Sequence, residues 1–76
     1  MSTITRTYLD ENAKPVTVTL EETNISDAIS ATLQYAQQKY KNAEITGMFS
    51  DRVNIWGFND PNFKNFGQGY YLHIED

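Results

Sequence analysis

The chain of 76 residues contains no cysteine and a single histidine, His73. Disulfides and thiolate metal sites are therefore excluded, and one histidine cannot build a zinc site. Chains of this size usually need a disulfide, a metal or a partner to supplement a small core. We therefore expect no cofactor, and a modest stability that rests on aromatic packing or on association with another chain.

Long apolar runs are also lacking. The N-terminal stretch MSTITRTYLDE has no apolar segment of the kind found in export signals. No window approaches the run of about eighteen apolar residues that a membrane-spanning helix requires. The sequence therefore predicts a cytoplasmic protein with no membrane partner.

Basic residues are few: six Lys and Arg stand against ten Asp and Glu, for a formal net charge of −4. The six are scattered along the chain, so they form no basic stripe. Binding to a phosphate backbone needs several clustered cations that release counterions. We therefore expect no direct binding to nucleic acid, and the acidic balance favours a partner with a basic surface.

A catalytic group is equally hard to find. His73 is the one side chain that titrates near neutrality, and its neighbours on the same strand face are Tyr71 and Glu75. A general base also needs a nucleophile and an orienting acid, which this pattern does not supply. The glycines at 57, 67 and 69 do not form a phosphate cradle, because Gly67-Gln68-Gly69 precedes a predicted strand, and neither a helix N-terminus nor a lysine follows. The sequence predicts a protein that is not an enzyme and has no catalytic, cofactor-binding or metal-binding residue.

Two alternating, β-branched segments open the chain. Residues 3–9 and 15–20 alternate between apolar and polar side chains, which predicts a hairpin. In the connection, Asn12 occupies a position at which a positive φ is tolerated, and Pro15 is expected to open the second strand because it cannot donate to a ladder.

The apolar period changes at Asn24, after which apolar residues recur at helical spacing and predict a helix over 24–42. Asn24 is the expected N-cap, with Asp27 in the first turn opposing the positive end of the helix dipole. Lys39 and Lys41 are expected in the last turns, where cations are favourable.

Three further strands are predicted over 45–50, 53–58 and 70–75. The order is then ββαβββ, and residues 1–76 form a single α+β domain of two layers. One helix packs on one face of an antiparallel sheet. Alternation places the following side chains beneath the helix: Val16, Val18, Leu20, Val53, Ile55, Leu72 and Ile74. It places the following on the opposite face: Thr17, Thr19, Asn54, Trp56, Phe58, Tyr71 and His73.

The face without a helix needs an explanation, because half of it is aromatic. In one interpretation, Phe63 and Phe66 fold back from loop 59–69 and cover Trp56 and Phe58 as a satellite core. In the other, part of the cluster stays exposed as a contact surface, since aromatic side chains supply interface hot spots. The candidate partner-binding residues are Trp56, Phe58, Phe63, Phe66, Tyr71 and His73.

At the level of class only, a small, acidic, cysteine-free domain without chemistry resembles the inhibitors that phages and mobile elements encode against host enzymes, anti-CRISPR proteins among them. No motif carries this resemblance, which rests on size and charge. It implies a non-enzymatic module that blocks a larger host protein by occupying its surface. The alternative is a homo-oligomer that associates through the aromatic sheet face. A third class, an enzyme or a binder of single-stranded nucleic acid, is opposed by the lone histidine and the net charge.

Overall fold

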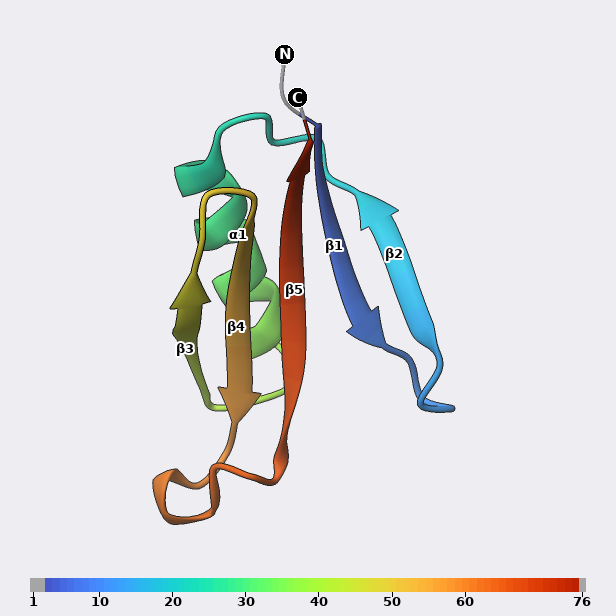
Figure 1. Cartoon of the computed structure of the whole chain (residues 1–76). Coiled ribbons are helices and arrows are strands. Elements are labelled where there is room, and N and C mark those ends of the chain that lie inside the picture. Colours follow the sequence, from blue (N-terminus) through green and yellow to red (C-terminus); the bar gives the residue numbers. More distant parts are fainter. Residues whose placement is uncertain (1–2, 76) are drawn as a thin grey trace.

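The computed structural model describes residues 3–75 as a five-stranded antiparallel sheet with one helix packed on one face (Figure 1). This confirms the predicted two-layer α+β fold of order ββαβββ. Its elements are β1 (Thr3–Leu9), β2 (Pro15–Thr19), α1 (Ile25–Gln37), β3 (Asn42–Met48), β4 (Arg52–Phe58), the short 3-10 helix η1 (Pro61–Phe63) and β5 (Gly67–Glu75). No helix between residues 3 and 75 has the length and apolar character that crossing a membrane requires.

The last strand is the centre of the sheet. Strands follow the spatial order β2-β1-β5-β4-β3, so β5 joins the N-terminal hairpin to the hairpin of β3 and β4. Leu72 of β5 pairs with Arg6 on one side and with Val53 on the other. Buried residues of α1 and of the three middle strands meet on the helix side of this centre. They are Ile4, Ala28, Ala36, Val53, Ile55, Tyr70 and Leu72.

The helix is shorter than predicted. It ends at Gln37, and the prediction that it continues to residue 42 is wrong. After Gln37 the chain turns, and Asn42 already pairs with Phe58 as the first residue of β3. Tyr40 still reaches the core, because a Cβ at Gly57 would lie 2.9 Å from its ring. Tyr40, the apolar residue whose spacing suggested another helical turn, therefore lies in the turn after the helix and packs on the sheet. Lys39 and Lys41 lie beyond the helix.

The predicted helix start is confirmed. The Oδ1 atom of Asn24 accepts a hydrogen bond of 2.8 Å from the backbone N–H of Ser26, and Asp27 lies in the first turn. The cap thereby satisfies one of the amides that the first turn of a helix leaves without a partner.

Replacing Asn24 with alanine should therefore lower the free energy of unfolding by about 1 kcal/mol. Urea titrations followed by circular dichroism measure this change. Asn24→Ser is the matched control, since serine also caps helices and should retain most of the stability. Equal urea midpoints for the alanine variant and the parent would contradict a stabilising cap.

The first hairpin departs from two predictions. The residue with positive φ in the turn is Ala13 (φ 59°), not Asn12. The Oδ1 atom of Asp10 accepts from the backbone N–H groups of Asn12 and Lys14, at 2.8 and 2.9 Å, and this turn places the left-handed residue between them.

The second departure concerns β2. The helix packs on β3, β4 and β5, with a smaller contact on β1, and β2 lies at the far side of β1 (Figure 1). Leu20 packs against the core, but Val16 and Val18 stay half-exposed, so the prediction that they lie beneath the helix is wrong. Alternation correctly assigns their face of the sheet, but a single helix is too narrow to cover five strands.

Three tyrosines pack together beside the helix. Tyr70 is 2% exposed, and its ring centre lies 6.1 Å from that of Tyr8 and 5.8 Å from that of Tyr35. Burial, reinforced by the neighbouring Tyr40, raises the pKa of Tyr70 from 10.0 to about 12. A hydrogen bond with Tyr8 and burial raise the pKa of Tyr35 as well.

These shifts predict alkaline destabilisation. Between the unfolded pKa of 10.0 and the folded pKa of about 12, the folded state holds the Tyr70 proton more tightly than the unfolded state does. The stabilisation is complete below pH 10 and is lost as the pH rises through about 12. Urea titrations across this range should show a falling free energy of unfolding, and Tyr70→Phe should flatten the decline. An identical decline in Tyr70→Phe would assign the effect to other groups.

Candidate partner-binding surface

Glycines at the start of β5 make room for aromatic rings on the face that the helix leaves open. Gly69 pairs with Trp56, and Gly67 pairs with Phe58. A Cβ at Gly67 would lie 3.0 Å from the Trp56 indole, and a Cβ at Gly69 would lie 2.9 Å from Cε2 of Tyr71. Since no side chain occupies these two positions, the Trp56 and Tyr71 rings lie directly over the backbone of β5.

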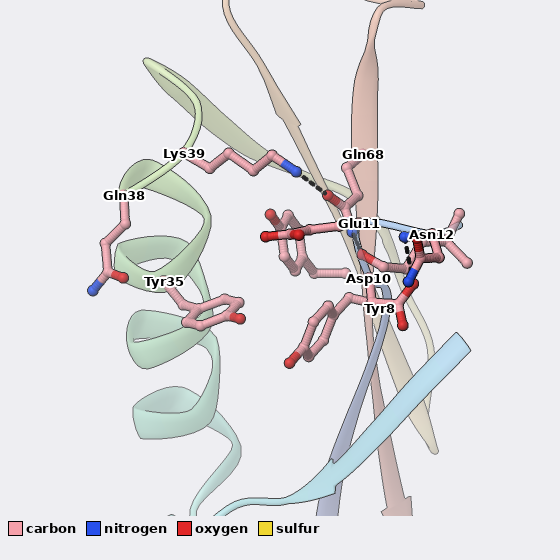
Figure 2. Close-up of a pocket in the computed structure, with 10 residues that line it drawn as sticks. Tyr8, Asp10, Glu11, Asn12, Tyr35, Gln38, Lys39 and Gln68 are labelled. Carbon is pink, nitrogen blue, oxygen red and sulfur yellow. Dashed lines mark hydrogen bonds between the residues drawn. The ribbon is translucent and has the colours of Figure 1, made fainter. Parts of the chain in front are cut away.

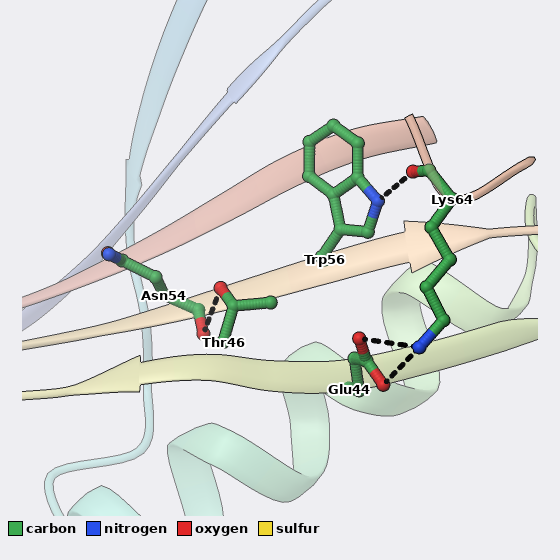
Figure 3. Close-up of polar contacts among 5 residues, drawn as sticks. All are labelled: Glu44, Thr46, Asn54, Trp56 and Lys64. Carbon is green, nitrogen blue, oxygen red and sulfur yellow. Dashed lines mark hydrogen bonds and ion pairs between the residues drawn. The ribbon is translucent and has the colours of Figure 1, made fainter. Parts of the chain in front are cut away.

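Loop 59–66 is fastened to this end of the sheet through Lys64. The indole N–H of Trp56 donates to the carbonyl oxygen of Lys64, and the Lys64 ammonium lies 3.4 Å from a carboxylate oxygen of Glu44 on β3 (Figure 3). The same ammonium is 5.1 Å from the centre of the Phe58 ring. Both the main chain and the side chain of Lys64 therefore hold the loop against β3 and β4.

The loop is also ordered from within. Oδ1 of Asp60 accepts from the backbone N–H of Asn62 at 2.9 Å and thereby caps η1. The backbone N–H of Phe63 donates to the Asp60 carbonyl at 2.9 Å, and that of Phe66 donates to the Phe63 carbonyl at 3.0 Å. The backbone at both Phe63 and Phe66 is therefore held by hydrogen bonds within the loop.

Their side chains are more than half exposed. Phe63 is 56% exposed and Phe66 is 70% exposed, and their ring centres are 6.2 Å apart. The interpretation in which these two residues cover Trp56 and Phe58 is therefore wrong. The loop does fold back, but Lys64 makes the contact and the phenylalanines face outward.

Phe58 does not belong to the exposed set. It is 5% exposed, beneath Lys64, so the hypothesis that it contacts a partner is corrected: its ring packs inside the molecule. Trp56 is half-buried, and Tyr71 is 48% exposed. We call Trp56, Phe63, Phe66 and Tyr71 the aromatic surface.

His73 lies on the same open face but further along β5, where it pairs with Thr5 and Arg52. Its Nδ1 atom is 3.4 Å from Oε1 of Glu75, and both side chains are largely exposed. Among residues 3–75, no three His, Cys, Asp or Glu side chains gather closely enough to hold a metal ion. His73 and Glu75 therefore form a solvent-exposed pair at the opposite end of β5 from Gly67 and Gly69.

A shallow hollow of about 320 Å³ adjoins the aromatic surface. Leu9, Trp56 and Tyr71 line it together with the glycines at 67 and 69, and the turn acids Asp10 and Glu11 lie at its edge. Leu9 is 47% exposed, and the sequence analysis assigned it no role. The alternation of side chains along residues 3–9 places Leu9 on the open face, and this was the sequence signal that could have identified it.

A second exposed apolar pair, at the turn between β3 and β4, was not predicted from the sequence. Met48 and Phe49 are 63% and 55% exposed, and the guanidinium carbon of Arg52 lies 5.4 Å from the centre of the Phe49 ring. This turn lies at the opposite end of the sheet from loop 59–66 (Figure 1).

A larger hollow, of about 470 Å³, lies on the helix side, where Tyr35 projects from α1 toward Tyr8 (Figure 2). Gln68 closes one end: its Oε1 is within 3.5 Å of the Lys39 ammonium and 3.4 Å of the Tyr40 hydroxyl, and its amide nitrogen donates to the Leu9 carbonyl. Among residues 3–75, no histidine, serine or threonine lines this hollow. Its polar groups tie the end of the helix to the end of β1.

The chain matches no family model, no curated protein and no solved structure.

Proposed function

We propose that this chain is a non-enzymatic protein-binding domain that occupies the surface of a larger protein through its aromatic surface. The observation that supports this most strongly is the pair Phe63 and Phe66, two large apolar rings more than half exposed and side by side on one loop. Exposed aromatic rings at this density are typical of interface hot spots.

The order of the loop adds to the argument. A flexible loop loses conformational entropy when it binds, whereas one already held in place loses less. Lys64 fastens this loop to Trp56 and Glu44, and Asp60 caps its turn. The phenylalanines are thus presented in one arrangement before any partner arrives.

Charge suggests the chemistry of the partner. The chain carries a formal charge of −4, and Asp10 and Glu11 border the hollow next to the aromatic surface. Carboxylates at the rim of an apolar contact favour a partner whose surface is basic. The narrower proposal is an inhibitor of a host enzyme, of the kind that phages and mobile elements encode, anti-CRISPR proteins among them; size and acidic charge support it.

The double variant Phe63→Ser, Phe66→Ser tests this function. Both side chains are exposed, so stability should change by less than about 1 kcal/mol. Binding should weaken by roughly 2–4 kcal/mol, because two adjacent hot-spot rings are lost. Affinity capture from the lysate of the native host, with mass spectrometry, identifies the partner, and calorimetry with that purified partner measures the affinity.

The variant Met48→Ser, Phe49→Ser is the matched control. It removes two equally exposed apolar side chains from the opposite end of the sheet and should leave the affinity unchanged. Equal capture by the Phe63/Phe66 variant and the parent would contradict the proposal. A change of solution mass in the Phe63/Phe66 variant, without loss of a captured partner, would favour the homo-oligomer.

A further inference from the structure

The two edges of the sheet differ in how well they resist pairing with another strand. At β3 the register shifts between Ile45 and Gly47, and Glu44 lies within the strand. A bulge and a charge both interfere with the addition of a further strand. At β2 the register with β1 is regular, the sequence PVTVT has no charge, and the only interruption is Pro15 at its first position.

The free edge of β2 presents unused backbone groups. The backbone N–H of Leu20 donates to the Ile4 carbonyl at 2.8 Å, and that of Asp10 donates to the Lys14 carbonyl at 2.9 Å. Hydrogen-bonded pairs alternate along an antiparallel ladder, so the even-numbered residues of this strand bond to β1. Thr17 and Thr19 therefore direct their N–H and C=O groups away from β1. Pro15 shares this orientation, so its missing N–H removes nothing from the ladder with β1.

The side chains of β2 are amphipathic and incompletely covered. Thr17 and Thr19 are exposed on the open face of the sheet, while Val16 and Val18 are half-exposed on the helix side, beyond the reach of α1. A strand added at this edge would cover the two valines and bond the two threonine backbones at the same time.

We propose that β2 pairs antiparallel with β2 of a second copy of this chain, about a two-fold axis through Val18. This register is the one in which the strand complements itself. Thr17 lies opposite the Thr19 of the other copy, so their outward N–H and C=O groups exchange both hydrogen bonds, and this happens on either side of the axis. Val16 meets Leu20, and the two copies of Val18 meet at the centre, so apolar side chains face one another on the helix side.

Charge supports the same register. Lys14 immediately precedes the strand and Glu22 follows three residues after its end, past a bend at Glu21, so a two-fold axis through Val18 brings the Lys14 of one copy near the Glu22 of the other, at both ends. The neighbouring self-complementary register, centred on Thr17, places Lys14 opposite Leu20, so the charge pair is lost. Pro15 lacks its donor in either register, because the Val18 register places it opposite Glu21. The Val18 register is therefore the better match.

Pairing of this kind joins the two sheets with both helices on one side and leaves the aromatic surfaces free. It stabilises the small core by mass action and gives the assembly two copies of the aromatic surface, which raises avidity for a partner with repeated sites. It does not depend on the proposed function, because β2 is an edge strand of the sheet, whereas loop 59–66 connects β4 to β5.

Sedimentation velocity and amide hydrogen exchange, both across a range of protein concentrations, test the dimer. The mass should rise toward that of two chains, and the Thr17 and Thr19 amides should gain protection as it does. The outward amides of β3 should not. A single-chain mass at every concentration up to millimolar, or a dimer in which these two amides exchange as fast as in the monomer, would overturn the proposal.

Charge variants test the register. Lys14→Glu places two carboxylates opposite each other at both ends and should weaken dimerisation roughly tenfold. The double variant Lys14→Glu, Glu22→Lys should restore it. Lys41→Glu changes the net charge equally on an exposed site outside β2 and should have little effect. Equal weakening by Lys41→Glu and Lys14→Glu, or no recovery in the double variant, would overturn the register.

Thr17→Pro removes the outward-facing N–H together with the exposed hydrogen bond of 2.9 Å between the Thr17 and Thr7 hydroxyls, and it leaves the backbone ladder with β1 intact, so circular dichroism should change little while the dimer is lost. Should this variant unfold, the charge variants still decide the matter. A dimer that survives Thr17→Pro but is abolished by Phe63→Ser, Phe66→Ser would overturn the proposal in favour of association through the aromatic surface.

Discussion

Replacing Tyr70 with alanine is expected to lower the free energy of unfolding by about 3–5 kcal/mol, the range for removing a buried aromatic ring. The ring belongs to β5, the central strand, packs against those of Tyr8 and Tyr35, and is 2% exposed. Since a domain of this size has only a few kcal/mol in total, most molecules should be unfolded at room temperature.

Tyr70→Phe is the control, because it keeps the ring and removes only the hydroxyl. Urea titrations followed by circular dichroism and by tyrosine fluorescence compare the two variants at neutral pH. Comparable stability of Tyr70→Ala and Tyr70→Phe would contradict a core centred on this ring.

Replacing Trp56 with alanine is expected to lower stability by about 2–3 kcal/mol and to weaken partner binding as well. The indole is half-buried over Gly67, so removing it costs less than removing a fully buried ring. The loss of its hydrogen bond to the Lys64 carbonyl contributes a further part. Loop 59–66 should then lose its anchor, so Phe63 and Phe66 should be presented less rigidly.

These effects are measured on Trp56→Ala by hydrogen exchange at the Phe63 and Phe66 amides, by thermal unfolding and by the affinity for the partner. Trp56→Phe, which retains a ring but has no N–H donor, separates the packing contribution from the hydrogen bond. Unchanged exchange at both amides in Trp56→Ala would contradict the anchoring role. Loss of affinity with unchanged stability would instead make Trp56 purely a contact residue.

The sequence by itself determined the features that depend on neighbours along the chain. Alternation in residues 3–9 and 15–20 predicted the first hairpin, and Asn24 marked the start of the helix. Both predictions rest on local physics: a strand exposes alternate side chains to one face, and a helix start needs an acceptor for its first amides. The order ββαβββ follows from reading these periods in sequence.

Only the tertiary structure decided where those elements end and what covers them. The helix stops at Gln37 because Asn42 must pair with Phe58, and Val16 and Val18 are only partly buried because β2 lies outermost, beside β1. Alternation placed Phe58 on the open face, yet Lys64 covers it. Phe63 and Phe66 stay exposed, whereas the Lys64 carbonyl accepts the Trp56 indole N–H and the Lys64 ammonium lies over Phe58. Each of these outcomes depends on partners distant in sequence, whose positions no local period encodes.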